Sequence, residues 1–384
     1  KITHDGVSLC FDGENYTWTS YDRIFVLAIG KCALDGAQAL EEILGDSITD
    51  GIVLDVRVGQ LKKLRSYAGT HPYPSETNVN VAREVVKLLR GVTERDLIIV
   101  LISGGGSSLL CLPFDLSCER LAEVTRVLTQ KGASIHELNT VRKHLSEIQG
   151  GHLARLAYPA RIVSLIFSDV PGNDISVIAS GPTVLDKSTV DDARAVLTKY
   201  GITDVPHLSE TPKDPKYFEN VRNILVLTNR DALTAMKECA EARGYATKII
   251  TESLEGEARE VGKKLARLTL PYRSCALAGG ETTVQIANTA GYGGRNQEVV
   301  LGALPNVDEH TVIIAVASDG WDNTDIAGAI GDKKIFMLAV DKSLDVRAHL
   351  RDNTSYSFFT TLGAGIMTGR LGSNVSDLFI VLKL

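Results

Sequence analysis

Carboxylates and glycines follow an apolar run in the stretch 164–182, which reads SLIFSDVPGNDISVIASGP. The run Leu165–Phe167 predicts a buried strand, and Asp169 and Asp174 come soon after it. In α/β proteins, ligands bind beyond the carboxyl ends of the strands. The stretch therefore predicts one part of an active-site edge. The alternative is a strand, a turn and an Asx cap, in which Asp and Asn serve only the backbone.

A second stretch combines glycines with hydroxyl groups, as an anion-binding turn does. The run 96–103, DLIIVLIS, predicts a buried strand that leads directly into glycines. Glycines let backbone amides approach a ligand closely, and the hydroxyls add donors, which suits a phosphate or a carboxylate. A sharp strand-to-helix turn would need the same glycines. The candidate binding residues of this turn are Ser103, Gly104, Gly105, Gly106, Ser107 and Ser108.

Positive side chains stand at three places where they could meet an anion. Lys31 lies between the predicted strand 23–30 and a helical pattern, and the free amides at a helix start favour anions. Arg142 and Lys143 together could clamp phosphate oxygens, Arg through its bidentate fork. Arg295 follows the glycine-rich loop 291–294 at a predicted helix start. The plain alternatives are a solvated lysine at a helix start and a solvated charged helix face.

Two more carboxylates, Glu281 and Asp319, follow the predicted strands 274–278 and 311–318. Apolar strands thus end in polar, glycine-rich turns at Ser103, Asp169, Glu281 and Asp319. This recurrence favours a functional edge over unrelated turns. Glu281 and Arg295 in one segment favour a site that handles charge.

The elements that position these residues alternate between apolar strands and amphipathic helices, which predicts an α/β fold. A length of 384 residues indicates two domains. The segment 207–219, HLSETPKDPKYFE, carries two prolines and many charges and is predicted to be a linker. The first residue is Lys, so we expect a short piece to precede it.

Composition argues against several classes of partner. The chain is 44% hydrophobic and has a formal net charge of −6, without a block of Lys and Arg, so nucleic acid is not expected. No apolar run reaches the roughly 18 residues of a membrane span. Six cysteines without CxxC spacing indicate thiols in a reducing compartment, and we expect a cytoplasmic location.

Several motifs are absent from the sequence. It contains no phosphate-binding P-loop and no nucleophile elbow. The nearest approach to a dinucleotide fingerprint, 363–369, has the wrong spacing. The residues alone predict a two-domain α/β protein with a carboxylate-bearing, anion-binding cleft. Phosphoryl transfer fits best, because it needs positioned cations, amide cradles and carboxylates for Mg²⁺ or for proton removal.

Long motifs spread over nearly the whole chain resemble those of the class II glycerate 2-kinases, whose C-terminal part is the MOFRL domain. They include LISGGGSSLL (101–110), LNTVRKHLSEIQGGHLA (138–154), SDVPGNDISVIASGPTVLD (168–186), GGRNQE (293–298) and SDGWDNTDIAGA (318–329). The resemblance implies a Rossmann-like parallel-sheet domain over 21–215 and a smaller MOFRL-type α/β domain over 216–384. Residues 1–20 are a candidate addition to the smaller domain. The active site would lie in the cleft between the two domains.

The resemblance also implies an activity, which is ATP-dependent phosphorylation of D-glycerate at O2 with Mg²⁺ or another divalent cation. Lys31 and Arg295 would neutralise the glycerate carboxylate and the phosphoryl group. Asp169 would take the hydroxyl proton or bind the metal, and Glu281 and Asp319 are candidate metal ligands. Phosphates would be held by the turn 103–108 and by Asn139, Arg142 and Lys143. A homodimer is a further candidate assembly. One departure is Asn173, where the family pattern has an Asp.

Two other functions compete with this interpretation. One is an NAD(P)H-dependent hydroxypyruvate reductase, which acts on the same carbon skeleton but should carry a dinucleotide fingerprint. The other is a non-catalytic sensor of a phosphosugar or nucleotide, which has little need for carboxylates that face cations.

Overall fold

The computed structural model describes residues 2–5, 8–11, 13–204, 207–287, 290–372 and 374–384. The chain divides into two compact units. The N-terminal unit comprises Lys1–Ser168 and Asp174–Val226, and the C-terminal unit comprises Asp169–Asn173 and Leu227–Leu384. Within the described residues, no helix combines the length and the apolar character needed to cross a membrane.

The N-terminal unit is built on a six-stranded sheet with the order β6-β5-β4-β7-β8-β9, and the pairs β4–β5, β4–β7, β5–β6 and β7–β8 are parallel. Its strands are β4 (Arg23–Ile29), β5 (Asp50–Asp55), β6 (Arg65–Ala68), β7 (Asp96–Ile102), β8 (Arg161–Phe167) and β9 (Val221–Leu227). A small antiparallel sheet contains β1 (Ile2–His4), β2 (Ser8–Phe11) and β3 (Glu14–Thr17).

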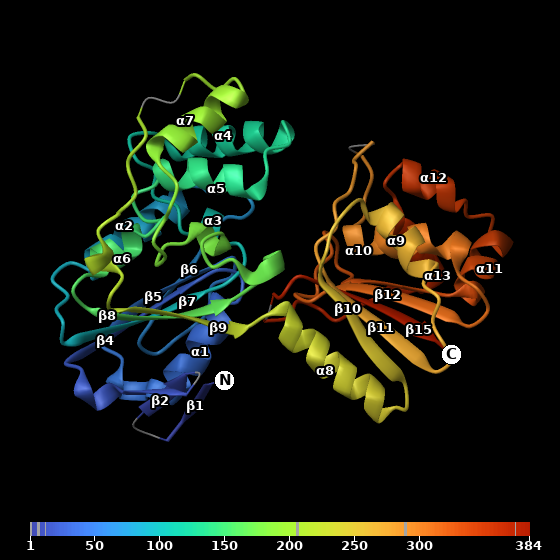
Figure 1. Cartoon of the computed structure of the whole chain (residues 1–384), viewed down its shortest axis with the longest axis horizontal. Coiled ribbons are helices and arrows are strands. Elements are labelled where there is room, and N and C mark those ends of the chain that lie inside the picture. Colours follow the sequence, from blue (N-terminus) through green and yellow to red (C-terminus); the bar gives the residue numbers. More distant parts are fainter. Residues whose placement is uncertain (1, 6–7, 12, 205–206, 288–289, 373) are drawn as a thin grey trace. The chain divides into compact units, whose positions relative to one another are not determined.

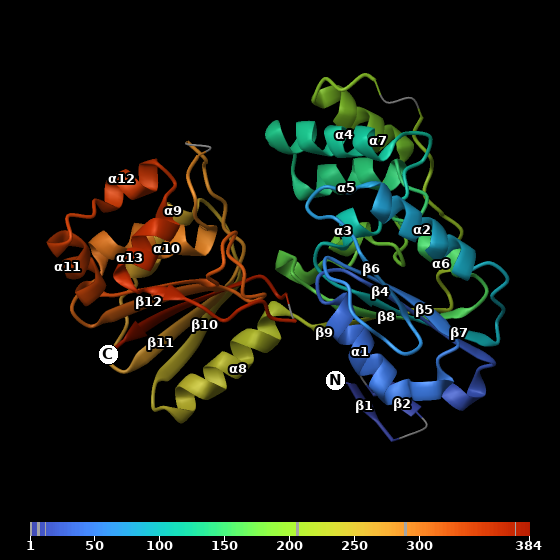
Figure 2. The same cartoon turned by 180° about the vertical axis from the view of Figure 1, so that it is seen from behind.

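Both faces of the six-stranded sheet are covered, which is why its strands read as continuous apolar runs. On one face, Val26, Ala28 and Ile99 pack with Ala37 and Leu40 of α1 (Ala33–Leu44). The small sheet adds its apolar side chains to this same cluster, namely Leu9 and Tyr16, with Trp18 next to them. These side chains therefore pack with the N-terminal unit, whereas the sequence suggested that residues 1–20 join the C-terminal domain. Figures 1 and 2 show α1 and the small sheet on the side opposite α2, α3 and α6.

The remaining helices of this unit are α2 (Glu76–Leu88), α3 (Gly106–Leu109), α4 (Cys118–Gln130), α5 (Ile135–His144), α6 (His152–Ala157) and α7 (Val190–Lys199), with short 3₁₀ turns η1 (Trp18–Ser20), η2 (Gly45–Ser47), η4 (Ile178–Ser180) and η5 (Pro215–Tyr217).

The predicted linker 207–219 is held to this unit. Ser209 N–H donates to the His144 carbonyl (2.8 Å), and Thr211 Oγ1 lies 3.1 Å from Asp186. The units accordingly divide after Val226 and not near residue 215.

The C-terminal unit contains a mixed six-stranded sheet with the order β10-β11-β15-β12-β13-β14. Its strands are β10 (Ala246–Leu254), β11 (Ser274–Gly280), β12 (Thr311–Ala317), β13 (Gly328–Gly331), β14 (Gly365–Ile366) and β15 (Asp377–Lys383). The strands β11 and β12 both run antiparallel to β15, so their carboxyl ends lie at one edge of the sheet, beside the start of β15. That edge carries the polar turns that the sequence analysis singled out.

Alternation along β11 and β15 places apolar side chains on both faces of this sheet. Cys275, Leu277 and Ile380 pack with Leu233 and Met236 of α8 (Asn229–Ala242). Ala276, Ala278, Phe379 and Val381 join the larger core with α9 (Ala258–Ala266), α10 (Arg295–Ala303), α12 (Val346–Arg351) and α13 (Ser355–Leu362). Figure 1 shows α8 alone on one face and α9, α10 and α13 on the other. The unit also contains α11 (Lys333–Asp341), η3 (Pro171–Asn173) and η6 (Leu304–Asn306).

Candidate functional site

In the N-terminal unit, the predicted glycine-rich turn lies at the carboxyl end of β7, next to the turn that follows β4. Lys31 N–H donates to the Gly104 carbonyl (2.9 Å), and Cys32 N–H donates to Ser103 Oγ (3.1 Å). Ser103 is fully buried and acts as the connector between the two turns. The structure therefore brings Lys31 and the glycine-rich turn together.

Gly105 and Gly106 allow the backbone of this turn to adopt its conformation and to lie close to its neighbours. Gly105 has φ of +84°, which favours glycine, and a Cβ at Gly106 would lie 2.6 Å from the Cβ of Ala179. Within the described part of the chain, the backbone N–H groups of Gly104, Gly105 and Ser107 donate no hydrogen bond. Neighbouring backbone N–H groups that have no hydrogen-bond acceptor form a concave site that suits an anion.

The two serines of the turn have different surroundings. Ser107 Oγ lies 3.0 Å from Ser180 Oγ, and Ser180 donates to Asn139 Oδ1 (2.6 Å). Asn139 is therefore linked to the glycine-rich turn through Ser180, a residue that the sequence analysis did not select. Ser108 Oγ donates to the Pro72 carbonyl (2.6 Å), and this bond holds the loop before α2.

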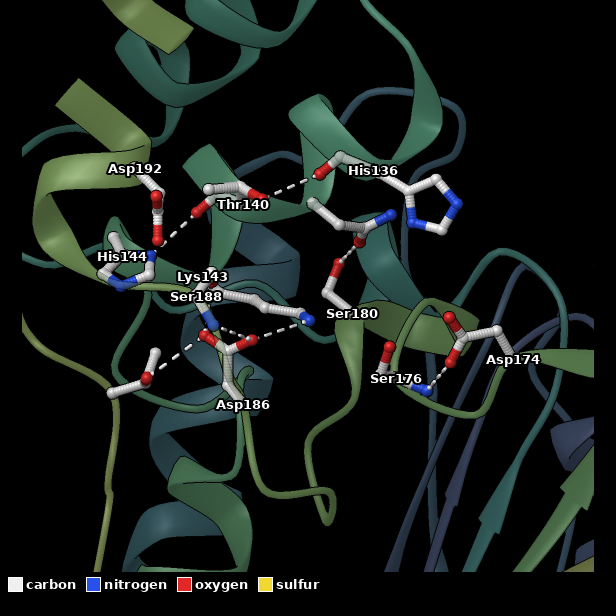
Figure 3. Close-up of polar contacts among 12 residues, drawn as sticks. His136, Thr140, Lys143, His144, Asp174, Ser176, Ser180, Asp186, Ser188 and Asp192 are labelled. Atoms are coloured by element: carbon white, nitrogen blue, oxygen red, sulfur yellow. Dashed lines mark hydrogen bonds and ion pairs between the residues drawn. The ribbon is translucent and has the colours of Figure 1, made fainter. Parts of the chain in front are cut away.

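Arg142 and Lys143, which the sequence suggested as one phosphate clamp, differ in their environments. Lys143 Nζ is buried and lies 3.1 Å from Asp186 Oδ1, as Figure 3 shows. Burial raises the pKa of Asp186, but Lys143 and the Ser188 hydroxyl outweigh this and the pKa is lowered overall. Arg142 forms no ion pair within the described residues, and desolvation lowers its pKa. Arg142 is thus the better placed of the two to bind an incoming anion.

In the C-terminal unit, Arg295 stands at the first position of α10 and is held by two carboxylates. Its Nε donates to Asp377 Oδ2 (2.6 Å) and its Nη2 to Asp377 Oδ1 (3.2 Å), while Nη1 donates to Glu281. The Arg295 side chain keeps 33% of its surface exposed, whereas Asp377 keeps 1%. Asp377 supports the guanidinium from the buried side, so Arg295 presents a fixed positive charge.

Burial and charge act in opposite directions on this pair. Burial would lower the pKa of Arg295, but Asp377 and Glu281 raise it above the ordinary arginine value, so Arg295 stays protonated. Burial raises the pKa of Asp377 to about 7, although Arg295 opposes the shift. The ion pair is therefore complete above neutral pH and weakens below it.

Asp322 occupies the start of α10. Its Oδ1 accepts from Asn296 N–H (3.1 Å) and its Oδ2 from Gln297 N–H (3.0 Å), and only 3% of the residue is exposed. A Cβ at Gly294 would lie 2.2 Å from this carboxylate, so glycine is required there. Because Asp322 already satisfies the helix amides, an anion would meet Arg295 and not the helix terminus.

The predicted carboxylates Asp169 and Asp319 also belong to the C-terminal unit. Asp169 Oδ2 accepts from Asn374 Nδ2 (3.1 Å), and its carbonyl accepts from Ser376 Oγ. Asp319 Oδ1 accepts from Trp321 N–H (3.0 Å), and its carbonyl accepts from Leu371 N–H (2.8 Å). Asp319 thus organises the turn after β12.

The structure gathers Glu281, Arg295 and Asp319 at the edge formed by β11, β12 and β15. Asp322 and Asp377 were not predicted as site residues, although Asp322 lies within the motif 318–329. An Asp directly before an apolar strand, as at 377, is a signal that could have drawn attention to the second. Across the described residues, no three His, Cys, Asp or Glu side chains come together as a metal site would require.

Comparisons with known proteins assign the family. A model described as a domain of unknown function (DUF4147) matches residues 2–210, and the MOFRL family model matches residues 274–377. D-glycerate 2-kinase of Thermotoga maritima is 37% identical over 377 residues, which cover 94% of this chain and 90% of the relative. This chain belongs to the MOFRL family of glycerate kinases.

A solved structure of the family agrees with the fold. The crystal structure of glycerate kinase from Thermotoga maritima has a TM-score of 0.85 at 36% identity, and the match covers 95% of this chain and 92% of that chain. The predicted family and the predicted α/β class, with a parallel sheet in the larger unit, are confirmed. A relative from Agrobacterium vitis, 38% identical over 94% of this chain and 87% of its own length, is provisionally named a hydroxypyruvate reductase.

Proposed function

We propose that this MOFRL-family chain transfers the terminal phosphoryl group of ATP to O2 of D-glycerate, which gives 2-phosphoglycerate and ADP. The observation that carries the proposal is the similarity to D-glycerate 2-kinase over 94% of the chain. Two arrangements in the structure that could bind an anion support it. One is the set of backbone N–H groups after β7 that donate no hydrogen bond, beside Lys31, and the other is the fixed guanidinium of Arg295.

Each proposed residue has a distinct role. Arg295 stabilises negative charge that develops on the transferring phosphoryl group, because a preorganised cation acts without reorganisation. Lys31 neutralises the glycerate carboxylate or a phosphate oxygen. Asp169 accepts the proton of the 2-hydroxyl as O2 forms its bond to phosphorus and the bond to the leaving ADP oxygen breaks. The turn 103–108, Asn139 and Arg142 hold phosphate oxygens.

Lys143 is the predicted phosphate ligand with the weakest support. It is committed to Asp186 in a buried pair, and an anion would have to displace a carboxylate to reach it. We therefore propose that Lys143 supports α5 and positions Arg142, its neighbour on that helix.

The residues predicted to bind Mg²⁺ do not form a ready cage for it. Glu281 is engaged by Arg295, and Asp319 accepts the Trp321 amide. The assignment of both as metal ligands stays a prediction. A kinase that takes Mg²⁺ with the phosphates of ATP needs only one or two protein carboxylates, and no step above depends on the ion.

The two competing functions receive less support. The glycine-containing segment 363–369 follows α13 and forms β14, so it is not the strand–turn–helix of a dinucleotide site. A non-catalytic sensor would not need the buried Asp377 carboxylate that holds the Arg295 guanidinium in place.

The test is a coupled assay with ATP, Mg²⁺ and D-glycerate. Coupling through enolase alone reports 2-phosphoglycerate, and added phosphoglycerate mutase also reports the 3-isomer. We expect signal in the first arm, and signal only with the mutase would contradict phosphorylation at O2. Oxidation of NADH with hydroxypyruvate in a parallel assay would instead support the reductase.

Arg295→Ala tests the role of the guanidinium. We expect kcat/KM to fall by about 10²–10³. The matched control is Arg230→Ala in the same unit, where Arg230 pairs with Glu252 and is 70% exposed. A loss below about threefold for Arg295→Ala, or an equal loss for both variants, would remove Arg295 from the reaction.

A further inference from the structure

Trp321 is an exposed tryptophan without a role in the hydrophobic cores of its unit. It is 39% exposed and contributes to neither of the two apolar clusters described for the C-terminal unit. It stands in the turn after β12, between Gly320 and Asp322. A turn built on an Asx interaction needs no aromatic side chain there, so the fold does not explain Trp321.

Arg370 stacks on this tryptophan. Its guanidinium carbon lies 4.1 Å from the centroid of the indole ring, which is a close cation–π contact. The two loops are fastened to each other, because Leu371 N–H donates to the Asp319 carbonyl and a Cβ at Gly320 would lie 2.0 Å from the Gly369 carbonyl. The indole and the planar guanidinium therefore form a fixed stacked pair, in which the guanidinium covers one face of the indole.

Two exposed apolar side chains lie close to Arg370 in the sequence. Met367 is 73% exposed and Leu371 is 47% exposed, and neither belongs to a described core cluster. Because the guanidinium covers one face of the indole, a planar heteroaromatic ring can stack on the outer face of the guanidinium or on the other face of the indole.

The stacked pair is connected to the cation proposed to act on phosphate. Asp322, the residue after Trp321, hydrogen-bonds to the amides of Asn296 and Gln297, which directly follow Arg295. Trp321 and Arg295 therefore flank the same helix start at the same sheet edge. A ligand with a planar ring at one end and phosphates at the other matches this arrangement.

We propose that Trp321 and Arg370 bind the base of the nucleotide by stacking. The inference rests on the proposed kinase function for the identity of the nucleotide. Stacking reads no hydrogen-bond pattern, since every base has a π-face, so the site should accept purine nucleoside triphosphates with little discrimination.

Fluorescence tests the contact without relying on activity. The chain has two tryptophans, and the other, Trp18, is buried in the N-terminal unit. The difference in emission between the wild type and Trp321→Phe therefore reports Trp321. We expect ADP to quench this difference signal, and tripolyphosphate and D-glycerate to leave it unchanged. ADP that binds by calorimetry without quenching would overturn the proposal, and so would equal quenching by tripolyphosphate.

Kinetics supply a second test. Trp321→Ala should raise the KM for ATP about tenfold, with kcat and the KM for D-glycerate nearly unchanged. The matched control is Tyr272→Ala, because Tyr272 is 66% exposed, packs edge-on against His310 and precedes β11 at the opposite edge of the sheet. Equal effects of the two variants would overturn the proposal. A preference for ATP over GTP above about a hundredfold would exclude binding by stacking alone.

The same measurements separate this inference from the proposed function. Kinase activity with no effect of Trp321→Ala and no ADP quenching would retain the function and overturn the base site. ADP quenching of Trp321 without any glycerate kinase activity would retain the base site and overturn the function.

Discussion

Asp377→Asn should impair the enzyme more at high pH than at low pH, because the substitution removes a charge that the wild type itself loses below neutrality. Asp377 makes two hydrogen bonds to the Arg295 guanidinium, at 2.6 and 3.2 Å. Asn keeps one acceptor oxygen and turns an amide group toward the cation, so at least one charged hydrogen bond is lost. Such a bond contributes about 1.5–3 kcal/mol.

The exposure of Arg295 sets the expected size of the effect. One third of its side chain is open to solvent, and Glu281 still holds Nη1, so we take the lower end of that range. A loss of ~1.4 kcal/mol in positioning corresponds to a roughly tenfold fall in kcat/KM. We expect this fall for Asp377→Asn at pH 8.

The pH dependence follows from the pKa of Asp377, which burial raises to about 7. One unit below that value about a tenth of the carboxyl groups are ionised, and one unit above it about nine tenths are. If a protonated Asp377 behaves as Asn does, the ratio of wild-type to variant kcat/KM should be about twofold at pH 6 and about ninefold at pH 8.

The assay is the enolase-coupled reaction measured between pH 6 and 8 for both proteins. Phosphate groups titrate near pH 6, but the substrates are common to both proteins, so the ratio cancels their titration. Asp308→Asn is the matched control, since Asp308 pairs with Lys383 at the other end of β15. A ratio for Asp377→Asn that stays constant across this pH range would refute the reasoning, and so would a ratio that also changes for the control.

Two further predictions concern stability. Lys143→Met should lower the free energy of unfolding by about 3 kcal/mol, because it leaves the Asp186 carboxylate buried without its cation. An unchanged denaturant midpoint would contradict this. Gly30→Ala should cost roughly 3 kcal/mol or more, because Gly30 has φ of +124° and a Cβ would lie 2.2 Å from Ser103 Oγ. Gly91→Ala is the comparison: it has positive φ without a neighbour within 4 Å, and should cost about 1 kcal/mol.

Local sequence was sufficient to predict the central strands β4 and β7, because buried parallel strands are apolar on both faces. β4 and β7 begin at the predicted residues 23 and 96, and each ends one residue before its predicted end. The apolar residues Ile175, Val177 and Ile178 favour a short helix, but only the short turn η4 forms there, since Ala179 and Ser180 take positive φ. Tertiary contacts impose that conformation, and Ala179 fills the space that Gly106 leaves open.

Side-chain roles were harder to predict than strand positions, because they depend on partners far away in the sequence. Lys143 looked like a phosphate ligand, but its partner Asp186 lies 43 residues further along the chain. Asp377 stands at the start of an apolar strand, but nothing in the local sequence connects it with Arg295, which lies 82 residues away. The boundary between the units also depends on contacts that are distant in the sequence. Ser209 and Thr211 contact His144 and Asp186, and these contacts assign the predicted linker to the N-terminal unit.

The two units would bind anions through different groups, and this difference predicts how each unit tolerates substitutions. The turn after β7 offers backbone amides, so its function depends on the space around Gly105 and Gly106 and is sensitive to any added Cβ. At α10 the amides are already satisfied by Asp322, and the positive charge resides on the Arg295 side chain. A side-chain cation can be moved or weakened by altering its carboxylates. The pH response of the enzyme should therefore arise from the C-terminal unit, where Asp377 titrates beneath Arg295.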